Sequence, residues 1–179
     1  MKVRPTPVPG AFLIDLEPQH DERGFFARAF CRDELATAGI AFEVAQANVA
    51  WNRARGTVRG LHYQRPPHAE SKLMRCTAGA AFVVLVDLRR DSPAFARPWT
   101  VALRAGEPTQ VLIPERVANG YQTLEDGTEL FYLMSASYQP TAAAGIRYDD
   151  PRLAIEWPLP AAVISERDRA LPPLGDLTL

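Results

Sequence analysis

Three histidines supply all the imidazole groups of this chain: His20, His62 and His68. No two of them form a His-x-His pair, which would place two imidazoles on one face of a strand. Zinc and related metals are held by clusters of three or four such ligands, so the sequence predicts no metal centre and no metal cofactor. A single imidazole can still act as a general acid or base near neutral pH.

His62 lies in the segment Arg-Gly-Leu-His-Tyr-Gln at residues 59–64. Its pattern is typical of a strand, and strand alternation predicts that His62 points to one face and Arg59 to the other. A single histidine on a half-buried strand is more often a hydrogen-bonded structural residue than a catalytic one. The residues alone therefore leave both roles open for His62.

Other side chains with useful chemistry are equally ambiguous on their own. Lys72 and Arg75 are typical of the charges on an edge strand, and we expect them to point to opposite faces. Tyr132 is typical of an aromatic side chain packed in a sheet. Asp168 is typical of a solvated charge in a helical turn. A catalytic role for any of them needs a further argument.

The elements that must position these residues are mostly strands. Sixteen prolines among 179 residues disfavour long helices. Apolar runs separated by turn residues recur about every 8–12 residues, which indicates an all-β sandwich or barrel. Among these we favour the jelly roll, because two facing sheets can hold a ligand cavity lined from several strands. The expected strands are 11–16, 25–30, 42–49, 58–64, 72–77, 80–88, 99–103, 109–113, 120–124 and 128–135.

A few short peripheral helices are expected, among them residues 31–39 and a stretch near 165–170. Gly39 is a natural stop for the first of them. We interpret residues 1–179 as a single domain in which residues 140–179 form a C-terminal elaboration.

Composition and charge exclude several classes of protein. Apolar residues make up 47% of the chain and charged residues 23%, as in ordinary globular domains. The net charge of −1 gives no overall attraction to nucleic acid or to an anionic membrane. Two cysteines are too few for a disulfide framework. The longest uncharged apolar run, 76–86, is far shorter than a membrane span, and no secretory signal is visible, so we expect a soluble cytoplasmic protein.

Taken together, the motifs resemble one family, the dTDP-4-dehydrorhamnose 3,5-epimerases, which are metal-free members of the cupin superfamily. The resemblance runs in order from about residue 5 to residue 175. Its most specific part is the 59–64 motif followed, ten residues after His62, by Lys72. Further pieces are 21–26 (Asp-Glu-Arg-Gly-Phe-Phe), 46–48 (Gln-Ala-Asn), 72–76, 86–89, 91–93, Tyr132, Tyr138, 149–151, 155–158 (Ile-Glu-Trp-Pro) and 165–168 (Ser-Glu-Arg-Asp).

The resemblance implies an isomerase that acts on a nucleotide-linked 4-keto-6-deoxyhexose with no cofactor. The ketone at carbon 4 acidifies the protons on carbons 3 and 5. Epimerisation then needs a base on one face, an acid on the other and a cation for the enolate oxygen. By resemblance, His62 is the base, Asp168 orients it, Tyr132 delivers the proton and Lys72 lies near the oxyanion.

The resemblance also implies a nucleotide site and a homodimer, with no nucleic-acid or membrane partner. An aromatic side chain at Tyr138 is expected to stack on the base, and residues around 23–28 to reach the pocket of the neighbouring subunit. The N-terminal strands would then be exchanged or packed at the dimer interface. The expected substrate-binding residues are Arg23, Phe26, Arg28, Gln46, Ala47, Asn48, Arg59, Lys72, Asn119, Tyr138 and Arg167.

Four residues depart from the family pattern. Asn119 stands where the family has a histidine, Arg28 and Ala143 stand where it has glutamates, and Arg167 stands where it has a lysine. The expected catalytic residues match the family pattern, whereas several of the expected substrate-binding residues differ from it. Two alternatives therefore stay open: a 3- or 5-epimerase of a CDP- or GDP-linked sugar that inverts one centre, and a non-catalytic cupin that binds nucleotide sugars.

Arg28 bears on the choice of nucleobase. A guanidinium only donates hydrogen bonds, which suits the acceptor edges of cytosine or guanine better than thymine. In the competing interpretation, Arg28 pairs with Glu22 or with a phosphate and leaves thymine accepted.

Overall fold

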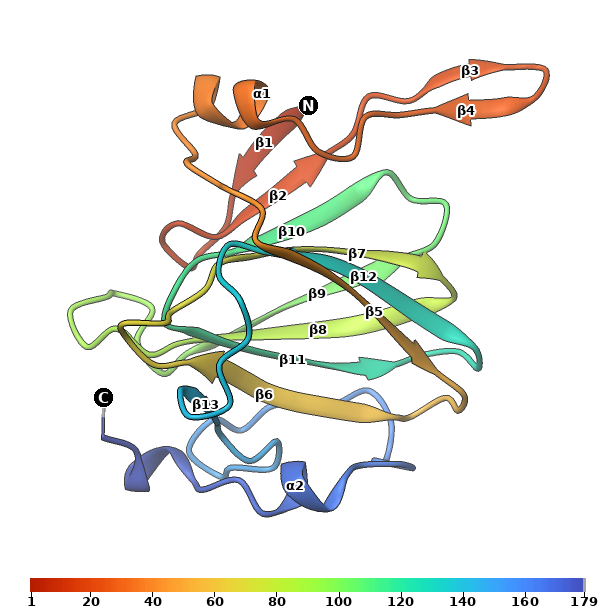
Figure 1. The fold of residues 1–179 in the computed structure, drawn as a ribbon. Helices are drawn as coiled ribbons and strands as arrows, with labels where there is room; N and C mark the ends of the chain where they lie inside the picture. The colour runs from red at the N-terminus through yellow and green to blue at the C-terminus, as the bar shows by residue number, and fades with distance from the viewer. Residues whose placement is uncertain (179) are drawn as a thin grey trace.

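Antiparallel strands dominate the computed structural model, which describes residues 1–178 (Figure 1). The strands are β1 (Lys2–Pro5), β2 (Phe12–Asp15), β3 (Gln19–Asp21), β4 (Gly24–Phe26), β5 (Gln46–Asn52), β6 (Val58–Gln64), β7 (Lys72–Ala78), β8 (Ala80–Asp87), β9 (Pro98–Arg104), β10 (Thr109–Ile113), β11 (Val117–Thr123), β12 (Thr128–Met134) and β13 (Ala143–Gly145). The short helices are α1 (Arg32–Thr37), α2 (Glu166–Arg169) and the 3-10 turn η1 (Leu174–Asp176).

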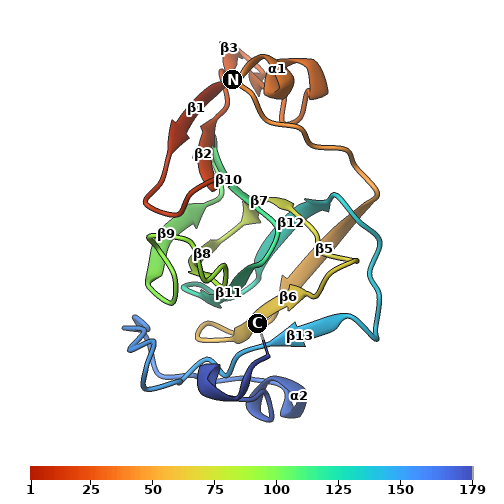
Figure 2. The ribbon, with the colours of Figure 1, turned by 90° about the vertical axis from the view of Figure 1, so that its left-hand side faces the viewer.

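Two sheets face each other across the core (Figure 2). The six-stranded sheet has the order β1-β2-β10-β7-β12-β5, and the five-stranded sheet has the order β13-β6-β11-β8-β9. The hairpin of β3 and β4 stands apart and projects from the body (Figure 1). The expected all-β jelly roll with short peripheral helices is confirmed.

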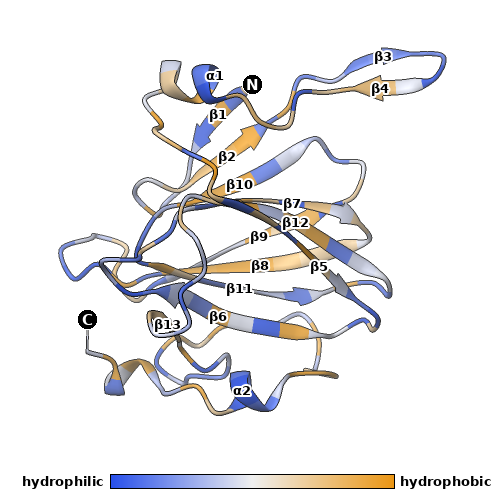
Figure 3. Ribbon diagram, in the orientation of Figure 1, coloured by the Kyte–Doolittle hydropathy of each residue, from blue (hydrophilic) through white to orange (hydrophobic). Residues whose placement is uncertain are grey.

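The core is apolar on both sides of β8, which is coloured as hydrophobic along its length in Figure 3. Val83 and Leu85 point into the space between the sheets. Val84 and Val86 face outward, where Leu153 and other residues of the C-terminal segment cover them. The segment after β12 therefore covers the outer face of the five-stranded sheet. Because β8 is buried on both faces, its apolar residues follow one another without a break.

Glycines set the geometry where β6 meets β11. Gly60 has a φ of 112°, a conformation that favours glycine. A Cβ atom on Gly60 would lie 2.7 Å from the Cα atom of Gly120 on the neighbouring strand. Either glycine replaced by alanine would push the two strands apart.

The ends of several strands differ from expectation. The expected strand 25–30 is only β4, which pairs with the unpredicted β3, and the expected strand 42–49 begins at Gln46. The remaining apolar residues of both segments lie in loops. Two of them, Phe30 and Phe42, make an edge-on contact near helix α1. Strand 120–124 starts earlier, at Val117, and β1 and β13 were not predicted.

The two expected helices are confirmed with small changes of length. Helix α1 is followed by Gly39, whose φ of 77° ends it as predicted. Helix α2 is capped by Ser165, whose hydroxyl oxygen accepts a hydrogen bond from the Asp168 amide. No helix within residues 1–178 is long and apolar enough to cross a membrane.

Candidate active site

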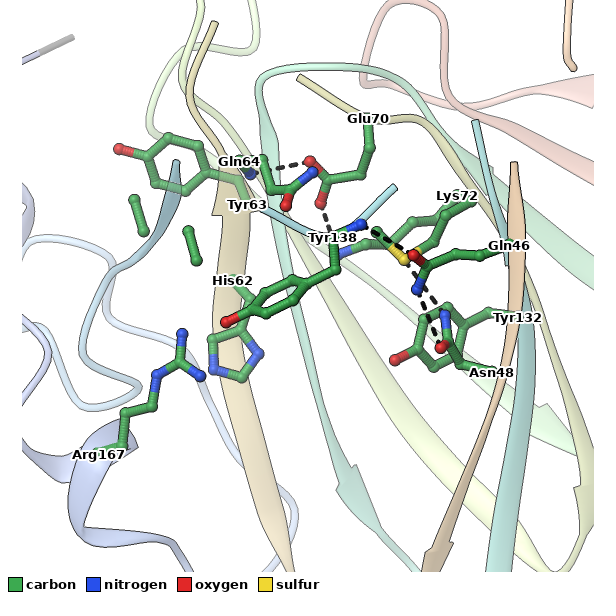
Figure 4. Close-up of a pocket in the computed structure, with 13 residues that line it drawn as sticks. Gln46, Asn48, His62, Tyr63, Gln64, Glu70, Lys72, Tyr132, Tyr138 and Arg167 are labelled. Carbon is green, nitrogen blue, oxygen red and sulfur yellow. Dashed lines mark hydrogen bonds and ion pairs between the residues drawn. The ribbon is translucent and has the colours of Figure 1, made fainter. Parts of the chain in front are cut away.

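Two adjoining cavities, of about 230 and 160 Å³, open between the sheets and share three side chains. These are His62 from β6, Lys72 from β7 and Tyr132 from β12. Figure 4 shows the larger cavity, with His62 and Arg167 on one side and Gln46 and Asn48 on the other. The remaining polar lining consists of Gln46, Asn48, Tyr63, Gln64, Glu70, Tyr138 and Arg167 in the larger cavity, and of Arg59, Asn119 and Tyr121 in the smaller one.

A buried carboxylate orients His62. The Nε2 atom of His62 lies 2.8 Å from Oδ1 of Asp168, and the other carboxylate oxygen accepts a hydrogen bond of 3.0 Å from the Gly60 amide. A carboxylate only accepts hydrogen bonds, so Nε2 carries the proton and Nδ1 carries the lone pair. The imidazole is therefore arranged to accept a proton at Nδ1.

The charge of Asp168 depends on these contacts. Burial alone would raise the pKa of Asp168, but hydrogen bonds from His62 and Gly60 outweigh it and the pKa is lowered. The carboxylate thus stays ionised at neutral pH and can stabilise a positive charge on the imidazole of His62.

Replacement of Asp168 by asparagine should cost stability in a pH-dependent way. The pKa of Asp168 in the folded protein lies below the reference value of 3.8, so its stabilisation is complete above that value and is lost as the pH falls below it. We expect a cost of roughly 1–2 kcal/mol at pH 7. The difference between the urea midpoints of the wild type and Asp168→Asn should narrow as the pH falls below 3.8, with the exposed Asp91→Asn as control. A gap that stays constant from pH 7 to pH 3 would contradict this.

Lys72 is buried at the floor of the site. Its Nζ atom lies 3.1 Å from Oε1 of Glu70 and 3.4 Å from Oδ1 of Asn119. Burial lowers the pKa of Lys72, and the neighbouring Glu70 opposes that shift. The interpretation of Lys72 as an edge-strand charge is wrong, because β7 lies between β10 and β12. Arg75 does point the other way, into an outer groove.

Four tyrosines line the two cavities, and two of them, Tyr121 and Tyr132, line the smaller one. Burial raises the pKa of Tyr132, so its phenol keeps its proton near neutral pH and can serve as an acid. Burial also raises the pKa of Tyr121 to about 12, and its hydroxyl donates to Oδ1 of Asn52 at 3.3 Å. The same amide oxygen accepts a hydrogen bond of 2.8 Å from Nε of Arg59.

Arg59 and His62 both line the smaller cavity, so the prediction that they point to opposite faces is wrong. Arg59 is paired with Tyr121 and His62 with Asn119. Three steps along β6 thus match two along β11, and β6 carries one extra residue. Such a bulge reverses the alternation and turns both side chains to the same side.

The sequence-predicted binding residues divide into two groups. Gln46, Asn48, Arg59, Lys72, Asn119, Tyr138 and Arg167 lie together around the cavities. The Tyr138 amide donates to Oε1 of Gln46 at 2.8 Å, which ties the loop after β12 to β5. Ala47 is not among the lining residues, because alternation along β5 turns it away from its neighbours.

The second group lies on and beside the projecting hairpin, away from the cavities of its own chain. Arg23 and Phe26 are exposed there, and Arg23 pairs with Asp21. Arg28 donates to Glu34 at 2.5 Å. Arg28 therefore pairs with a carboxylate, as the competing interpretation expected, but its partner is Glu34 and not Glu22.

Sequence reasoning did not find Glu70 or Tyr121. A signal for Glu70 was present, because a Glu-x-Lys spacing puts both side chains on one face of an extended chain. Tyr121 lies in a strand where only its burial, and not its hydroxyl, follows from the pattern. Within residues 1–178, no cluster of three or more His, Cys, Asp or Glu side chains is placed to hold a metal ion.

The fold and the site define a class. An imidazole held by a carboxylate and a protonated tyrosine line one cavity of a jelly roll, and these groups together can move protons on and off carbon. The model of the dTDP-4-dehydrorhamnose 3,5-epimerase family matches residues 5–176. The chain belongs to that family.

Individual relatives support this assignment. The dTDP-4-dehydrorhamnose 3,5-epimerase of Shigella flexneri is 36% identical over 169 residues, which cover 94% of this chain and 93% of the relative. A crystal structure of the Bacillus anthracis enzyme with TDP and PPi bound is 36% identical with a TM-score of 0.94, covering 97% of this chain and 99% of that chain. A 3'-monoepimerase from Streptomyces bikiniensis in complex with dTDP-quinovose is 34% identical with a TM-score of 0.89, covering 96% and 87%.

Proposed function

We propose that this chain inverts carbons 3 and 5 of a dTDP-linked 4-keto-6-deoxyhexose, with His62 as base and Tyr132 as acid. One observation carries the proposal. His62 belongs to β6 in the five-stranded sheet, whereas Tyr132 belongs to β12 in the six-stranded sheet. A sugar ring held between the facing sheets has the base on one side and the acid on the other, which is the arrangement that inversion requires.

The proton transfers follow from this placement. Nδ1 of His62 removes the proton from carbon 3 or carbon 5, and the electron pair of that bond moves to the oxygen on carbon 4. The ammonium of Lys72 stabilises the resulting enolate. The phenol of Tyr132 then gives its proton to the other face of the same carbon, as the enolate electrons return to form the new carbon–hydrogen bond. Proton exchange with water resets His62 and Tyr132.

The nucleotide is expected to be dTDP. The Bacillus anthracis relative binds TDP, and the Streptomyces bikiniensis relative binds a dTDP-sugar. Arg28, the residue that would favour cytosine or guanine, donates a hydrogen bond from Nη1 to Glu34 instead. Gln46, Asn48 and Tyr138 supply amide groups and an aromatic ring to the lining of the larger cavity, where a nucleobase can be bound and stacked.

Proton NMR in deuterated water tests the proposal. The wild type is incubated with dTDP-, CDP- and GDP-linked 4-keto-6-deoxyglucose, and deuterium and configuration are followed at carbons 3 and 5. Rapid exchange and inversion at both carbons of the dTDP-sugar are expected. Inversion of one carbon alone would make the chain a single-centre epimerase, and binding without exchange would make it a non-catalytic cupin.

A homodimer completes the proposal. The hairpin that carries Arg23 exposes 72% of Phe26, which is costly in a monomer. On the outer face of the six-stranded sheet, Val49 and Trp51 are 61% and 54% exposed. A second copy can cover these surfaces, with the hairpin reaching into its cavity.

Sedimentation equilibrium should give about twice the chain mass of 19.8 kDa. Trp51→Glu should shift the equilibrium toward the monomer, because it puts a charge into the apolar contact. Glu107→Gln in an exposed turn should leave the mass unchanged. A wild type that sediments as a monomer at assay concentrations would contradict the proposed dimer.

A further inference from the structure

Glu70 is a buried carboxylate in the site to which no role has yet been given. It lies in the loop before β7 and lines the larger cavity (Figure 4). Its side chain is only 3% exposed. Its Oε2 atom accepts a hydrogen bond of 2.9 Å from the backbone N–H of Gln64, and its Oε1 atom lies 3.1 Å from Nζ of Lys72. Both carboxylate oxygens are therefore held, one by the backbone of β6 and one by Lys72.

Lys72 needs a partner to remain charged in this place. Removing an ammonium from water favours its neutral form unless an opposite charge lies close by. Several titratable or charged side chains from different elements line the two cavities with Lys72. They are Arg59, His62 and Tyr63 of β6, Tyr121 of β11, Tyr132 of β12, and Glu70, Tyr138 and Arg167 outside the strands. Glu70 is the one carboxylate among these lining residues.

The contacts of Lys72 also direct it. An ammonium has three N–H donors. Glu70 and Asn119 accept two of them, Glu70 from the loop before the strand and Asn119 from the opposing sheet. Asn119 is itself fixed, because its Nδ2 atom donates to the carbonyl of His62 at 3.0 Å. One N–H of Lys72 is left for a ligand.

We propose that Glu70 is a positioning residue that keeps Lys72 protonated and leaves one N–H of its ammonium for the enolate oxygen. The contact with the enolate rests on the proposed function. The charge of Lys72 does not, so it can be tested without substrate.

The chain offers a direct probe, because Lys2 and Lys72 are its only lysines. Protein labelled with 13C-lysine should show two Cε signals, and Lys2→Arg assigns them. In Glu70→Gln, which keeps the shape and removes the charge, the titration midpoint of Lys72 should fall by roughly 1–3 pH units. Glu107→Gln removes an exposed carboxylate and should not move it. An unmoved midpoint in Glu70→Gln, or a Lys72 that is neutral at pH 7 in the wild type, would overturn the proposal.

Kinetics supply a second measurement that a merely structural role would not move. The high-pH limb of kcat in Glu70→Gln should shift down by the same interval as the Lys72 midpoint, with activity recovered at lower pH. A pH-independent loss of kcat would overturn the link between Glu70 and Lys72.

If Glu70→Gln does not fold, Glu70→Asp keeps the charge at a longer distance. It should lower the midpoint by a smaller amount, and no shift would count against the proposal. A wild type that lacks epimerase activity but keeps Lys72 charged would refute the proposed function and leave the role of Glu70 intact.

Discussion

His62→Asn is expected to lower kcat by at least roughly 10²–10⁴-fold, the usual contribution of acid–base catalysis. The variant loses the Nδ1 lone pair that takes the proton from carbon, while an amide can still hydrogen bond to Asp168. Exchange of the protons on carbons 3 and 5 should fall together with turnover, because both begin with this step. Rates of deuterium uptake by NMR and of product formation provide the measurement.

His68→Asn is the matched control for this variant. His68 is exposed in the loop after β6, and its side chain does not line the cavities. It should keep wild-type rates. Near-normal exchange in His62→Asn would show that another group is the base and would remove the role of the His62–Asp168 pair.

Tyr132→Phe should separate exchange from inversion. The variant keeps His62 and Lys72, so it should still form the enolate and take deuterium back from the His62 side. Without the phenol, delivery of a proton to the other face should fall by about 10²–10⁴-fold. The product with inverted configuration should therefore decrease far more than the rate of exchange.

Configuration and deuterium content, measured in the same NMR time course, distinguish the outcomes. Tyr148→Phe removes a hydroxyl that does not line either cavity and should behave as the wild type. Equal losses of exchange and inversion in Tyr132→Phe would mean that this tyrosine is not the proton donor.

Local patterns were a good guide to individual strands. Residues 58–64 and 109–113 form strands with the predicted bounds, because each has turn residues on both sides. Strands β3 and β13 lack a local sequence pattern that predicts a strand. They are strands because they pair with β4 and β6. The order of strands in a sheet is also invisible to local patterns, which is why Lys72 was assigned to an edge.

The site depends on contacts that are distant in sequence. Asp168 lies 106 residues after His62, and the sequence around either residue does not predict their contact. The residues alone leave a structural and a catalytic role open for His62. Only the resemblance to a family predicts that His62 and Asp168 act together. The bulge at Gly60 turns Arg59 to the same side as His62, against simple alternation. Glu70 was missed because it precedes the predicted strand.

The most direct test of the central claim is a crystal structure of the His62→Asn, Tyr132→Phe double variant with dTDP-linked 4-keto-6-deoxyglucose. This variant should bind the sugar without turning it over. We expect carbon 3 or carbon 5 to lie between residues 62 and 132, one on each face of the ring. The oxygen of carbon 4 should lie within hydrogen-bond distance of Nζ of Lys72. A ring with both side chains on one face, or with its ketone turned away from Lys72, would contradict it.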